Sequence, residues 1–315
     1  MHSPPFHKII GHERVIEVLT RLFDSGRVPH AFLFVGADHS GRRTFIQACL
    51  ERLKGEVVSE HDPNLMWLKR EMNEKTGKRK VAIGVEQVRA LNERLSMGGL
   101  GGGVKMAVIE EADRLLGAAA NAILKTLEEP RGNTVFFLRA HALSDVMPTI
   151  RSRCMILRLS TVPRLTIQEA LVRRGVSPRD AAEAAAASFG CPGAAIRFLE
   201  DGELRARLAT ASGQLSTLLR SETAERLAQV GTMLPTKEGD ARKEALALLD
   251  GWEAGLRDAL LQSLGLTQIQ SAQVDVPEQP IRFWLEALRR VRTLRVGLDQ
   301  QAHPLLTLEE VVMEW

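Results

Sequence analysis

The first half of the chain alternates between short apolar runs and stretches with helical periodicity. The apolar runs cover residues 31–35, 104–109 and 134–138. They are rich in branched and aromatic residues, and short runs of this kind predict strands that are buried on both faces, as in a parallel sheet. Residues 13–23 instead carry Ile16, Leu19 and Phe23 at helical spacing, and Gly26 follows as a stop signal. The pattern predicts an α/β arrangement.

The second half of the chain, from about residue 161, follows helical spacing only. Predicted helices cover residues 166–174, 178–189, 193–200 and 308–312. Two long apolar stripes lie between the last two of these helices. They consist of Leu246, Leu249, Trp252, Leu256 and Leu260, and of Trp284, Leu288, Val291 and Leu298. Stripes at this spacing are typical of helices that pack into a core.

The length of 315 residues exceeds what one hydrophobic core usually organises, so we expect two or three domains. The change from a mixed to a purely helical pattern places a boundary near residue 160. The longer helical remainder begins near residue 204. The predicted domains are therefore residues 1–160, 161–203 and 204–315.

Composition and charge restrict the possible classes of protein. The hydrophobic and charged fractions, 44% and 26%, are those of an ordinary globular protein, and no apolar run approaches the roughly 20 residues of a membrane-spanning helix. The first residues do not have the pattern of a secretory signal, so we expect a cytoplasmic protein. A formal net charge of +3 is too small to indicate nucleic-acid binding over the whole surface.

The three cysteines, Cys49, Cys154 and Cys191, lie far apart in the sequence and form no CxxC pair. This spacing indicates neither a zinc site nor a disulfide framework. We expect three reduced thiols that are mostly buried, and no bound metal.

A degenerate phosphate loop follows the first apolar run. A phosphate loop of the form GxxxxGK[ST] uses glycines to wrap the phosphates, a lysine to reach them and a hydroxyl to hold magnesium. Here Gly36 and Gly41 are kept, but Arg42 replaces the lysine and Arg43 the hydroxyl residue. Thr44 comes one residue late, which turns its side chain by about 100° on a helix. The loop either binds nucleotide weakly through its backbone and Arg42, or only joins strand to helix.

Two acids, Glu110 and Glu111, end the second apolar run. Carboxylates at the carboxyl end of a buried parallel strand are where a nucleotide-binding sheet would hold a metal and polarise water. We therefore include both residues in the candidate site, together with the phosphate loop.

Two longer strings carry a family resemblance. Residues 121–130 read NAILKTLEEP and residues 148–154 read PTIRSRC. At this separation after an acidic strand, they resemble the clamp-loader branch of the AAA+ ATPases. The resemblance implies an α/β AAA+ domain with a parallel sheet over residues 1–160, a small helical lid over residues 161–203, and an all-α collar domain over residues 204–315 that joins subunits.

The resemblance also implies that the chain's own ATPase site is degenerate. Active relatives have an aspartate for magnesium where Glu110 stands, and the longer side chain would displace the metal, while Glu111 takes the place of the glutamate that orients water. A sensing arginine of the relatives corresponds to Gly193, with Arg197 one turn later. Either Ala140 or His141 takes the position of a polar sensor of the terminal phosphate. We expect weak or absent ATP binding, no hydrolysis and no cofactor.

The same resemblance assigns a role to Arg153. The letters SRC, residues 152–154, resemble the family's signature for a subunit that reaches into its neighbour's site. Arg153 would supply a guanidinium in trans to the neighbour's ATP, an effect that is large in nucleotide hydrolases. Arg151 is the second candidate, and Ser152 would act as a helper or cap. The alternative is that Arg153 only pairs with a carboxylate on its own surface.

With the phosphate-loop lysine and hydroxyl lost and the trans arginine kept, the resemblance implies a non-hydrolysing clamp-loader subunit of DNA polymerase III, inactive as an ATPase on its own and part of the DNA-directed DNA polymerase holoenzyme. Its partners would be ATPase (gamma/tau) and delta subunits, and through the complex the sliding clamp and primed DNA. One alternative is an ATP-hydrolysing gamma/tau-type motor subunit. Another is a DNA-binding scaffold, for which Arg289, Arg290, Arg292 and Arg295 form a basic cluster, although a solvated face or subunit contacts explain that cluster as well.

Overall fold

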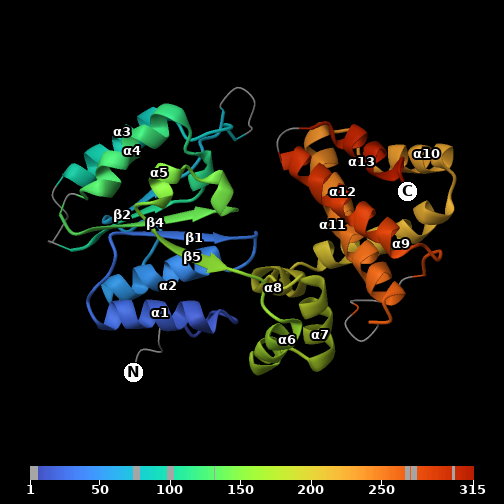
Figure 1. Ribbon diagram of the computed structural model, residues 1–315, viewed down its shortest axis with the longest axis horizontal. Helices are drawn as coiled ribbons and strands as arrows, with labels where there is room; N and C mark the ends of the chain where they lie inside the picture. The colour runs from blue at the N-terminus through green and yellow to red at the C-terminus, as the bar shows by residue number, and fades with distance from the viewer. Residues whose placement is uncertain are drawn as a thin grey trace. The chain divides into compact units, whose positions relative to one another are not determined.

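The computed structural model describes residues 6–73, 79–97, 103–130, 132–266, 270, 275–299 and 302–315. The chain forms two compact units (Figure 1). Unit 1 comprises residues 1–171 and 190–193, and unit 2 comprises residues 172–189 and 194–315. The three predicted domain ranges stay a prediction.

Unit 1 contains a five-stranded sheet in which all neighbouring strands run parallel. The strands are β1 (Ala31–Gly36), β2 (Leu65–Leu68), β3 (Lys105–Ile109), β4 (Thr134–Ala140) and β5 (Met155–Leu159). Their order across the sheet is β2-β3-β4-β1-β5. The order brings the ends of β1, β3 and β4, which are far apart in the sequence, to one edge of the sheet, where the loop after β1 and the acids after β3 meet.

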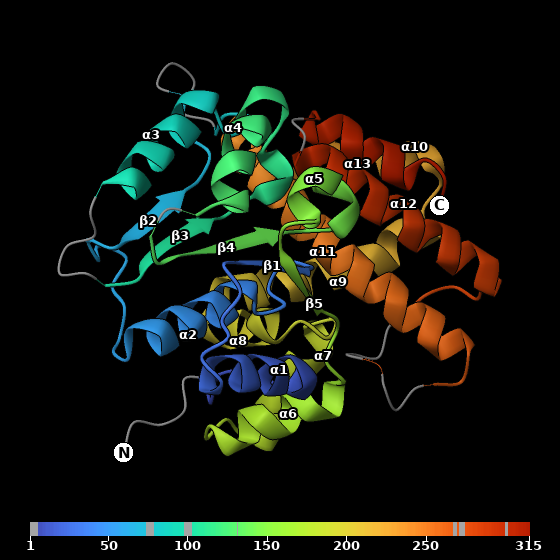
Figure 2. The ribbon, with the colours of Figure 1, turned by 60° about the vertical axis from the view of Figure 1, so that its left-hand side comes forward.

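Helices cover both faces of the sheet (Figure 2). Helices α1 (Glu13–Asp24) and α2 (Arg42–Lys54) lie on one face, and α3 (Val85–Ser96) and α4 (Gly117–Glu128) lie on the other. The strands are therefore buried on two sides, as their continuous apolar runs predict. Phe32 and Phe34 of β1 belong to the core beneath α1 and α2, where Phe32 stacks on Phe137 at 5.5 Å between ring centroids.

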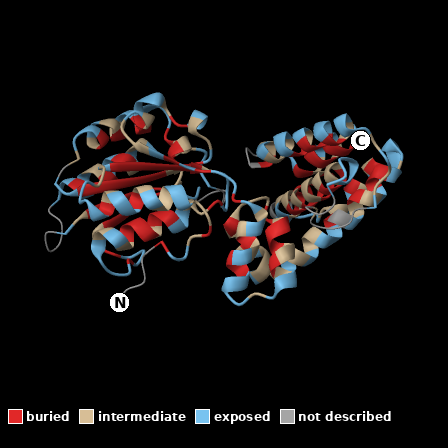
Figure 3. Cartoon of the chain, turned by 60° about the horizontal axis from the view of Figure 1, so that its bottom comes forward, coloured by how far each residue is buried: buried red, intermediate tan, exposed pale blue. Residues whose placement is uncertain are grey.

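Alternate residues of the same strands form the second core of unit 1. Leu33 and Val35 of β1 pack with Ile123 and Leu127 of α4 on the face opposite the phenylalanines. A strand whose odd and even positions are both apolar satisfies two layers of helices at once, because successive side chains point to opposite faces. The buried positions appear as continuous segments along the strands in Figure 3.

Short elements connect the strands of unit 1. These are the 3-10 helices η2 (Ala112–Arg114) and η3 (Leu143–Asp145) and the short helix α5 (Pro148–Arg151). Helix α6 (Arg164–Arg173) ends at the boundary between the units. Ile83 forms an isolated parallel bridge with Leu115, and α3 starts two residues later at Val85. Most of the glycine-rich loop of residues 98–103 lies outside the described residues.

The described part of unit 2 consists of helices. They are α7 (Pro178–Ala187), α8 (Pro192–Glu200, of which the first two residues belong to unit 1), α9 (Gly202–Arg220), α10 (Thr223–Met233), α11 (Glu238–Ser263), α12 (Ile281–Asp299) and α13 (Pro304–Val312). Trp252 and Trp284 are almost fully buried at the centre of its core, together with Leu249 and Val291. Both predicted stripes therefore face a common core, which confirms them.

None of the described helices is long and apolar enough to cross a bilayer. The basic cluster of α12 is largely neutralised within unit 2. Arg290 pairs with Glu310 and Glu314, Arg292 donates to Glu253 at 2.6 Å, and Arg295 donates to Asp250 at 2.6 Å. Positive charge that is matched in this way gives little attraction for phosphates, so the cluster favours the structural interpretation over DNA binding.

Candidate functional site

Both glycines of the degenerate phosphate loop lie at backbone positions that favour glycine. Gly41 precedes α2 with a φ of +102°, a backbone conformation that favours glycine, and its carbonyl accepts the helical hydrogen bond from Phe45 at 2.9 Å. A Cβ atom on Gly36 would lie 2.6 Å from the Leu159 carbonyl oxygen, so only glycine fits there.

Arg42 is bound by the loop's own carboxylate. Its Nη2 donates to Oδ1 of Asp38 at 2.5 Å, and the Arg42 side chain is only 10% exposed. His141 Nδ1 lies 3.5 Å from the same oxygen. A hydrogen bond from His141 holds the pKa of Asp38 well below its usual range, and Arg42 adds to the effect against the opposing influence of burial. The same hydrogen bond raises the pKa of His141. The guanidinium thus faces an internal anion.

The residue that replaces the metal-binding hydroxyl turns away from the loop. Arg43 pairs with Glu60, and its guanidinium lies over the Trp67 ring at 5.7 Å from the centroid. Ser40, one residue before Gly41, has a buried hydroxyl without a hydrogen-bond partner among the described residues, while its carbonyl lies 3.1 Å from His12 Nε2. The Arg43 guanidinium is thus engaged outside the loop.

The two acids after β3 are held by arginines. Arg70 donates two hydrogen bonds to the Glu111 carboxylate, at 2.8 Å and 2.6 Å. Burial acts to raise the pKa of Glu111, but Arg70 outweighs it and the pKa is lowered. Arg139 of β4 donates to the Glu110 backbone carbonyl at 2.7 Å and lies 3.6 Å from its carboxylate. The Glu111 carboxylate is thus engaged on both oxygens, whereas Arg139 contacts Glu110 mainly through its backbone carbonyl.

Sequence reasoning missed both of these arginines. Arg70 lies within the charge run of residues 69–80, a pattern that is typical of a solvated segment, and its partner Glu111 is 41 residues away in the chain. Arg139 could have been found, because it is the charged residue of an otherwise apolar strand, β4. A charge in a buried strand usually has a partner close by.

The segment aligned with the relatives' sensing arginine lies directly against the loop. The Gly193 backbone N–H donates to the His39 carbonyl at 2.8 Å, and a Cβ on Gly193 would lie 2.8 Å from that oxygen. The two candidates for the polar-sensor position differ in their surroundings. Ala140 is buried within β4, whereas His141 follows the strand and faces Asp38. His141 is therefore the polar group of the pair that faces the loop.

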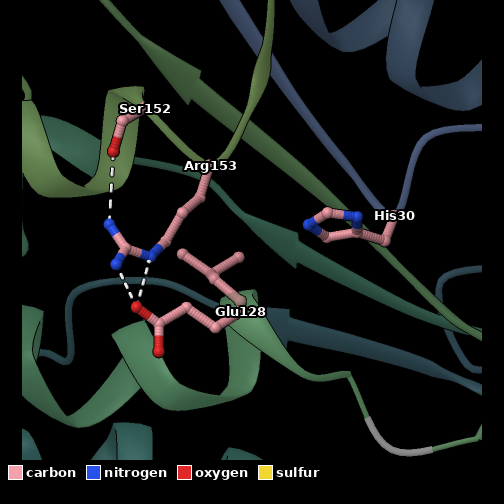
Figure 4. A pocket seen from close by; sticks show the side chains of 5 residues that line it. His30, Glu128, Ser152 and Arg153 are labelled. Atoms are coloured by element: carbon pink, nitrogen blue, oxygen red, sulfur yellow. Dashed lines mark hydrogen bonds and ion pairs between the residues drawn. The ribbon is translucent and has the colours of Figure 1, made fainter.

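A separate pocket surrounds Arg153 (Figure 4). It is lined by His30, Leu127, Glu128, Ser152 and Arg153 and has a volume of about 490 Å³. Pro148 starts the short helix α5, Ser152 is its C-cap, and β5 begins at Met155. Arg153 therefore stands at the turn between helix and strand, and β5 then enters the sheet beside β1.

The Arg153 guanidinium donates hydrogen bonds to three residues, Glu128, Thr149 and Ser152. Its Nε donates to Glu128 Oε1 at 2.9 Å, and Nη2 donates to the same oxygen. Its Nη1 donates to the Thr149 carbonyl at 2.7 Å and to the Ser152 hydroxyl at 3.2 Å. The side chain is 28% exposed. The pairing with a carboxylate of its own surface occurs, as the alternative interpretation expects, while the role in trans stays a prediction.

Arg151 and Ser152, the two residues before Arg153 in the chain, make other contacts than Arg153 does. Arg151 is partly buried and its Nη1 donates to the Leu143 carbonyl at 3.3 Å, so it joins α5 to η3. The Ser152 hydroxyl donates to the Thr149 carbonyl at 3.1 Å while it accepts from Arg153. The Arg151 side chain is thus held by a backbone carbonyl of η3, and Arg153 is the arginine that lines the pocket.

The cysteines show no reactive thiol. Burial raises the pKa of the Cys49 thiol strongly and that of Cys154 to about 12, and it also raises the pKa of Cys191. Thiols with raised pKa values are poor nucleophiles and poor metal ligands. Among the described residues, no three His, Cys, Asp or Glu side chains gather as a metal site would require.

Comparisons with known proteins give one consistent result. A family model described as "DNA polymerase III, delta subunit" matches residues 11–163. The DNA polymerase III subunit delta' of Haemophilus influenzae is 39% identical over 40% of this chain and 38% of its own length. The subunit delta' of Escherichia coli K12 is 34% identical over 64% of this chain and 57% of its own length. The chain thus spans about two fifths to three fifths of the length of these relatives.

A solved structure extends the likeness to both units. The DNA polymerase III gamma subunit-related protein of Thermotoga maritima matches 93% of this chain and 97% of its own with a TM-score of 0.53. At 18% identity this match shows the fold alone. Together with the parallel sheet and the helical C-terminal region, it confirms the predicted AAA+ α/β fold class.

Proposed function

We propose that the protein is a non-hydrolysing clamp-loader subunit, because residues 11–163 match the family model described as "DNA polymerase III, delta subunit" and the similar proteins of Haemophilus influenzae and Escherichia coli are delta' subunits. In this role it holds a neighbouring ATPase subunit and presents Arg153 to that subunit's ATP. The work of the complex is to load a sliding clamp on primed DNA. Its direct partners are ATPase subunits of the gamma/tau type and the delta subunit.

The observation that carries this proposal is the different state of two arginines. Arg42, in the chain's own phosphate loop, is nearly buried against Asp38. Arg153, in the SRC signature, lines an open pocket and is partly exposed. A guanidinium can stabilise charge on a neighbour's phosphate only if that neighbour can reach it. Arg153 meets this condition, and Arg42 does not.

The chain's own site supports the absence of hydrolysis. Phosphoryl transfer in AAA+-type sites depends on a magnesium ion and on a carboxylate that orients water. Arg43 forms an ion pair with Glu60 rather than facing the loop, and Arg70 forms an ion pair with the Glu111 carboxylate. These residues do not fit a magnesium–nucleotide complex, so no step of the proposed function passes through this site. We propose that the protein works without a nucleotide or metal of its own.

The test is ATP hydrolysis by the reconstituted clamp loader with clamp and primed DNA. We expect Arg153→Ala to leave assembly intact and to remove one neighbour's share of the phosphate released in the first turnover. The matched control is Arg179→Ala, which breaks an exposed arginine–glutamate pair with Glu183 in α7. Hydrolysis equal to wild type in the Arg153 variant would show that the proposal is wrong.

Two measurements on the isolated chain separate this function from its alternatives. Appreciable ATP turnover that Glu111→Gln abolishes would identify a motor subunit. Tight DNA binding with a steep dependence on salt would identify a DNA-binding scaffold, because such a slope reports phosphate contacts. We expect neither from the isolated chain.

A further inference from the structure

The partners of Arg153 fall into a fixed group and a movable one. The Thr149 carbonyl and the Ser152 hydroxyl belong to α5 and its C-cap, so they are built into the same turn as Arg153. Glu128 is the last residue of α4 and approaches from across the pocket (Figure 4). Its side chain is 47% exposed. A rotation of this side chain alone would therefore release part of the guanidinium.

Glu128 occupies the side of the guanidinium that an incoming oxyanion needs. Its Oε1 accepts from both Nε and Nη2, while Nη1 is directed to the fixed partners. Arginine binds carboxylates and phosphates best through a pair of neighbouring N–H groups. Because the Nε and Nη2 pair is held by Glu128, a phosphate that binds Arg153 through this pair has to replace the carboxylate.

The surroundings of Glu128 weaken its ion pair with Arg153. It stands at the C-terminus of α4, where the helix dipole carries partial negative charge, and Glu129 follows it directly. A carboxylate at this position is stabilised by Arg153 but repels any further anion. Ion pairs between partly exposed groups also contribute little stability. Replacement of Glu128 by the more highly charged phosphate chain of a nucleotide is therefore favourable.

We propose that Glu128 is a positioning residue that holds Arg153 ready in the free subunit and then yields the Nε and Nη2 groups to phosphate oxygens of the neighbour's nucleotide. The inference rests on the proposed function of Arg153 in trans. The fixed partners Thr149 and Ser152 keep the guanidinium in place during this exchange. Glu128 is thus a competitor of the phosphate, and its charge sets how readily Arg153 engages.

The test is Glu128→Gln in the reconstituted clamp loader. Glutamine keeps the size and one acceptor oxygen but lacks the charge, so it competes less with phosphate. We expect kcat for ATP hydrolysis to rise about two- to fivefold, which corresponds to about 0.4–1 kcal/mol, with KM for ATP and assembly unchanged. The matched control is Glu129→Gln, which makes the same charge change one residue later. No described contact joins Glu129 to Arg153, and we expect that variant to behave as wild type.

Adding Glu128→Gln to the Arg153→Ala variant distinguishes a failure of the proposed function from a failure of this inference. There we expect Glu128→Gln to have no effect, because the competitor acts only through Arg153. If Arg153→Ala itself leaves hydrolysis unchanged, the proposed function fails and this inference fails with it. If Arg153→Ala lowers hydrolysis but Glu128→Gln equals the Glu129→Gln control, the exchange alone is wrong. A lowered kcat in both Glu128→Gln and Glu128→Ala would also overturn it, because Glu128 would then be a permanent support.

Discussion

The phosphate loop and the Arg153 pocket use the same pair of groups in opposite ways. In each, an arginine is held by a carboxylate of the same unit. Asp38 comes from the same loop as Arg42, four positions earlier, whereas Glu128 reaches Arg153 from another helix. The Arg42 side chain is 10% exposed and the Arg153 side chain is 28% exposed. The first pair closes a site, and the second keeps a guanidinium available at the surface.

The presence of an arginine in a motif therefore does not indicate what the arginine binds. His141 reinforces Asp38 from the end of β4, and Gly193 lies against the loop backbone. No comparable second layer covers Arg153 among the described residues, where the pocket is lined by a few side chains only.

The largest expected effect is the difference in ATP hydrolysis between the Arg153→Ala and Arg42→Ala variants. At the neighbour's site served by this subunit, Arg153→Ala should slow hydrolysis by about 10³- to 10⁵-fold, as for arginines supplied in trans elsewhere. Arg42→Ala should leave hydrolysis by the complex unchanged, because its guanidinium is engaged within its own loop. Single-turnover phosphate release by the complex checks both. Equal losses in the two variants would remove the distinction between the sites.

The next effect concerns the backbone contact that covers the loop. Gly193→Ala would place a Cβ within 2.8 Å of the His39 carbonyl oxygen, which cannot move freely because it is backbone. We expect a loss of about 1–3 kcal/mol in the free energy of unfolding, seen as a lower Tm. The control is Gly202→Ala, where a Cβ meets nothing within 4 Å and no loss is expected. An unchanged Tm for Gly193→Ala would show that the segment is not packed on the loop.

A smaller effect should follow from releasing Arg42. Asp38→Asn removes the charge that holds the guanidinium, so the loop should gain affinity for inorganic pyrophosphate. We expect about tenfold tighter binding than in wild type, or about 1.4 kcal/mol, by calorimetry on the isolated chain. Glu60→Gln is the matched control, because it removes the carboxylate that pairs with Arg43 outside the loop. Equal binding by both variants would mean that Asp38 does not mask the loop.

The smallest expected effect is a dependence on pH. The pKa of His141 is raised by Asp38, whereas Arg42 and burial act against the rise and Asp113 adds to it. A raised pKa means that the protonated histidine stabilises the fold fully below its unfolded pKa, near 6.5, and that this gain is lost as the pH rises through the folded value. Asp38 stays ionised throughout, because its pKa is lowered.

Because His141 is partly exposed, we expect only about half a kcal/mol or less from this pair. Thermal melts of wild type and His141→Gln at pH 6 and pH 8.5 check it. The difference in Tm between the two proteins should be larger at pH 6 than at pH 8.5. The opposite order would contradict the assigned direction of the pKa.

Much of the fold was predictable because its signals are local. The continuous apolar runs of β1 and β4 indicate strands covered on both faces, and the structure confirms this in Phe32 and Leu33, adjacent residues buried in separate cores. The stripe around Trp252 and the stripe around Trp284 identify the core of unit 2 for the same reason. Periodicity fixes which side of an element is buried, since each side chain's direction follows from the backbone.

The candidate site was predictable only in its residue types. Gly36, Gly41 and Arg42 are recognisable as an altered phosphate loop, and Glu110 and Glu111 as acids at a strand end. The sequence contains no local signal that Arg70 would bind Glu111, because the two lie 41 positions apart and meet only when β2 and β3 pair. The pairing of Arg153 with Glu128, 25 positions apart, was foreseen as a kind of contact but not as a particular partner.

The sequence alone specifies the alternation of strand and helix, the glycines of the loop and the losses of the phosphate-binding lysine and hydroxyl. These depend on each residue's own conformational and chemical properties. Which charges meet, and which remain within reach of solvent, is set by the tertiary fold. Charge pairing and exposure depend on distances between segments that are remote in the chain, and those distances exist only after the sheet has brought the strands together.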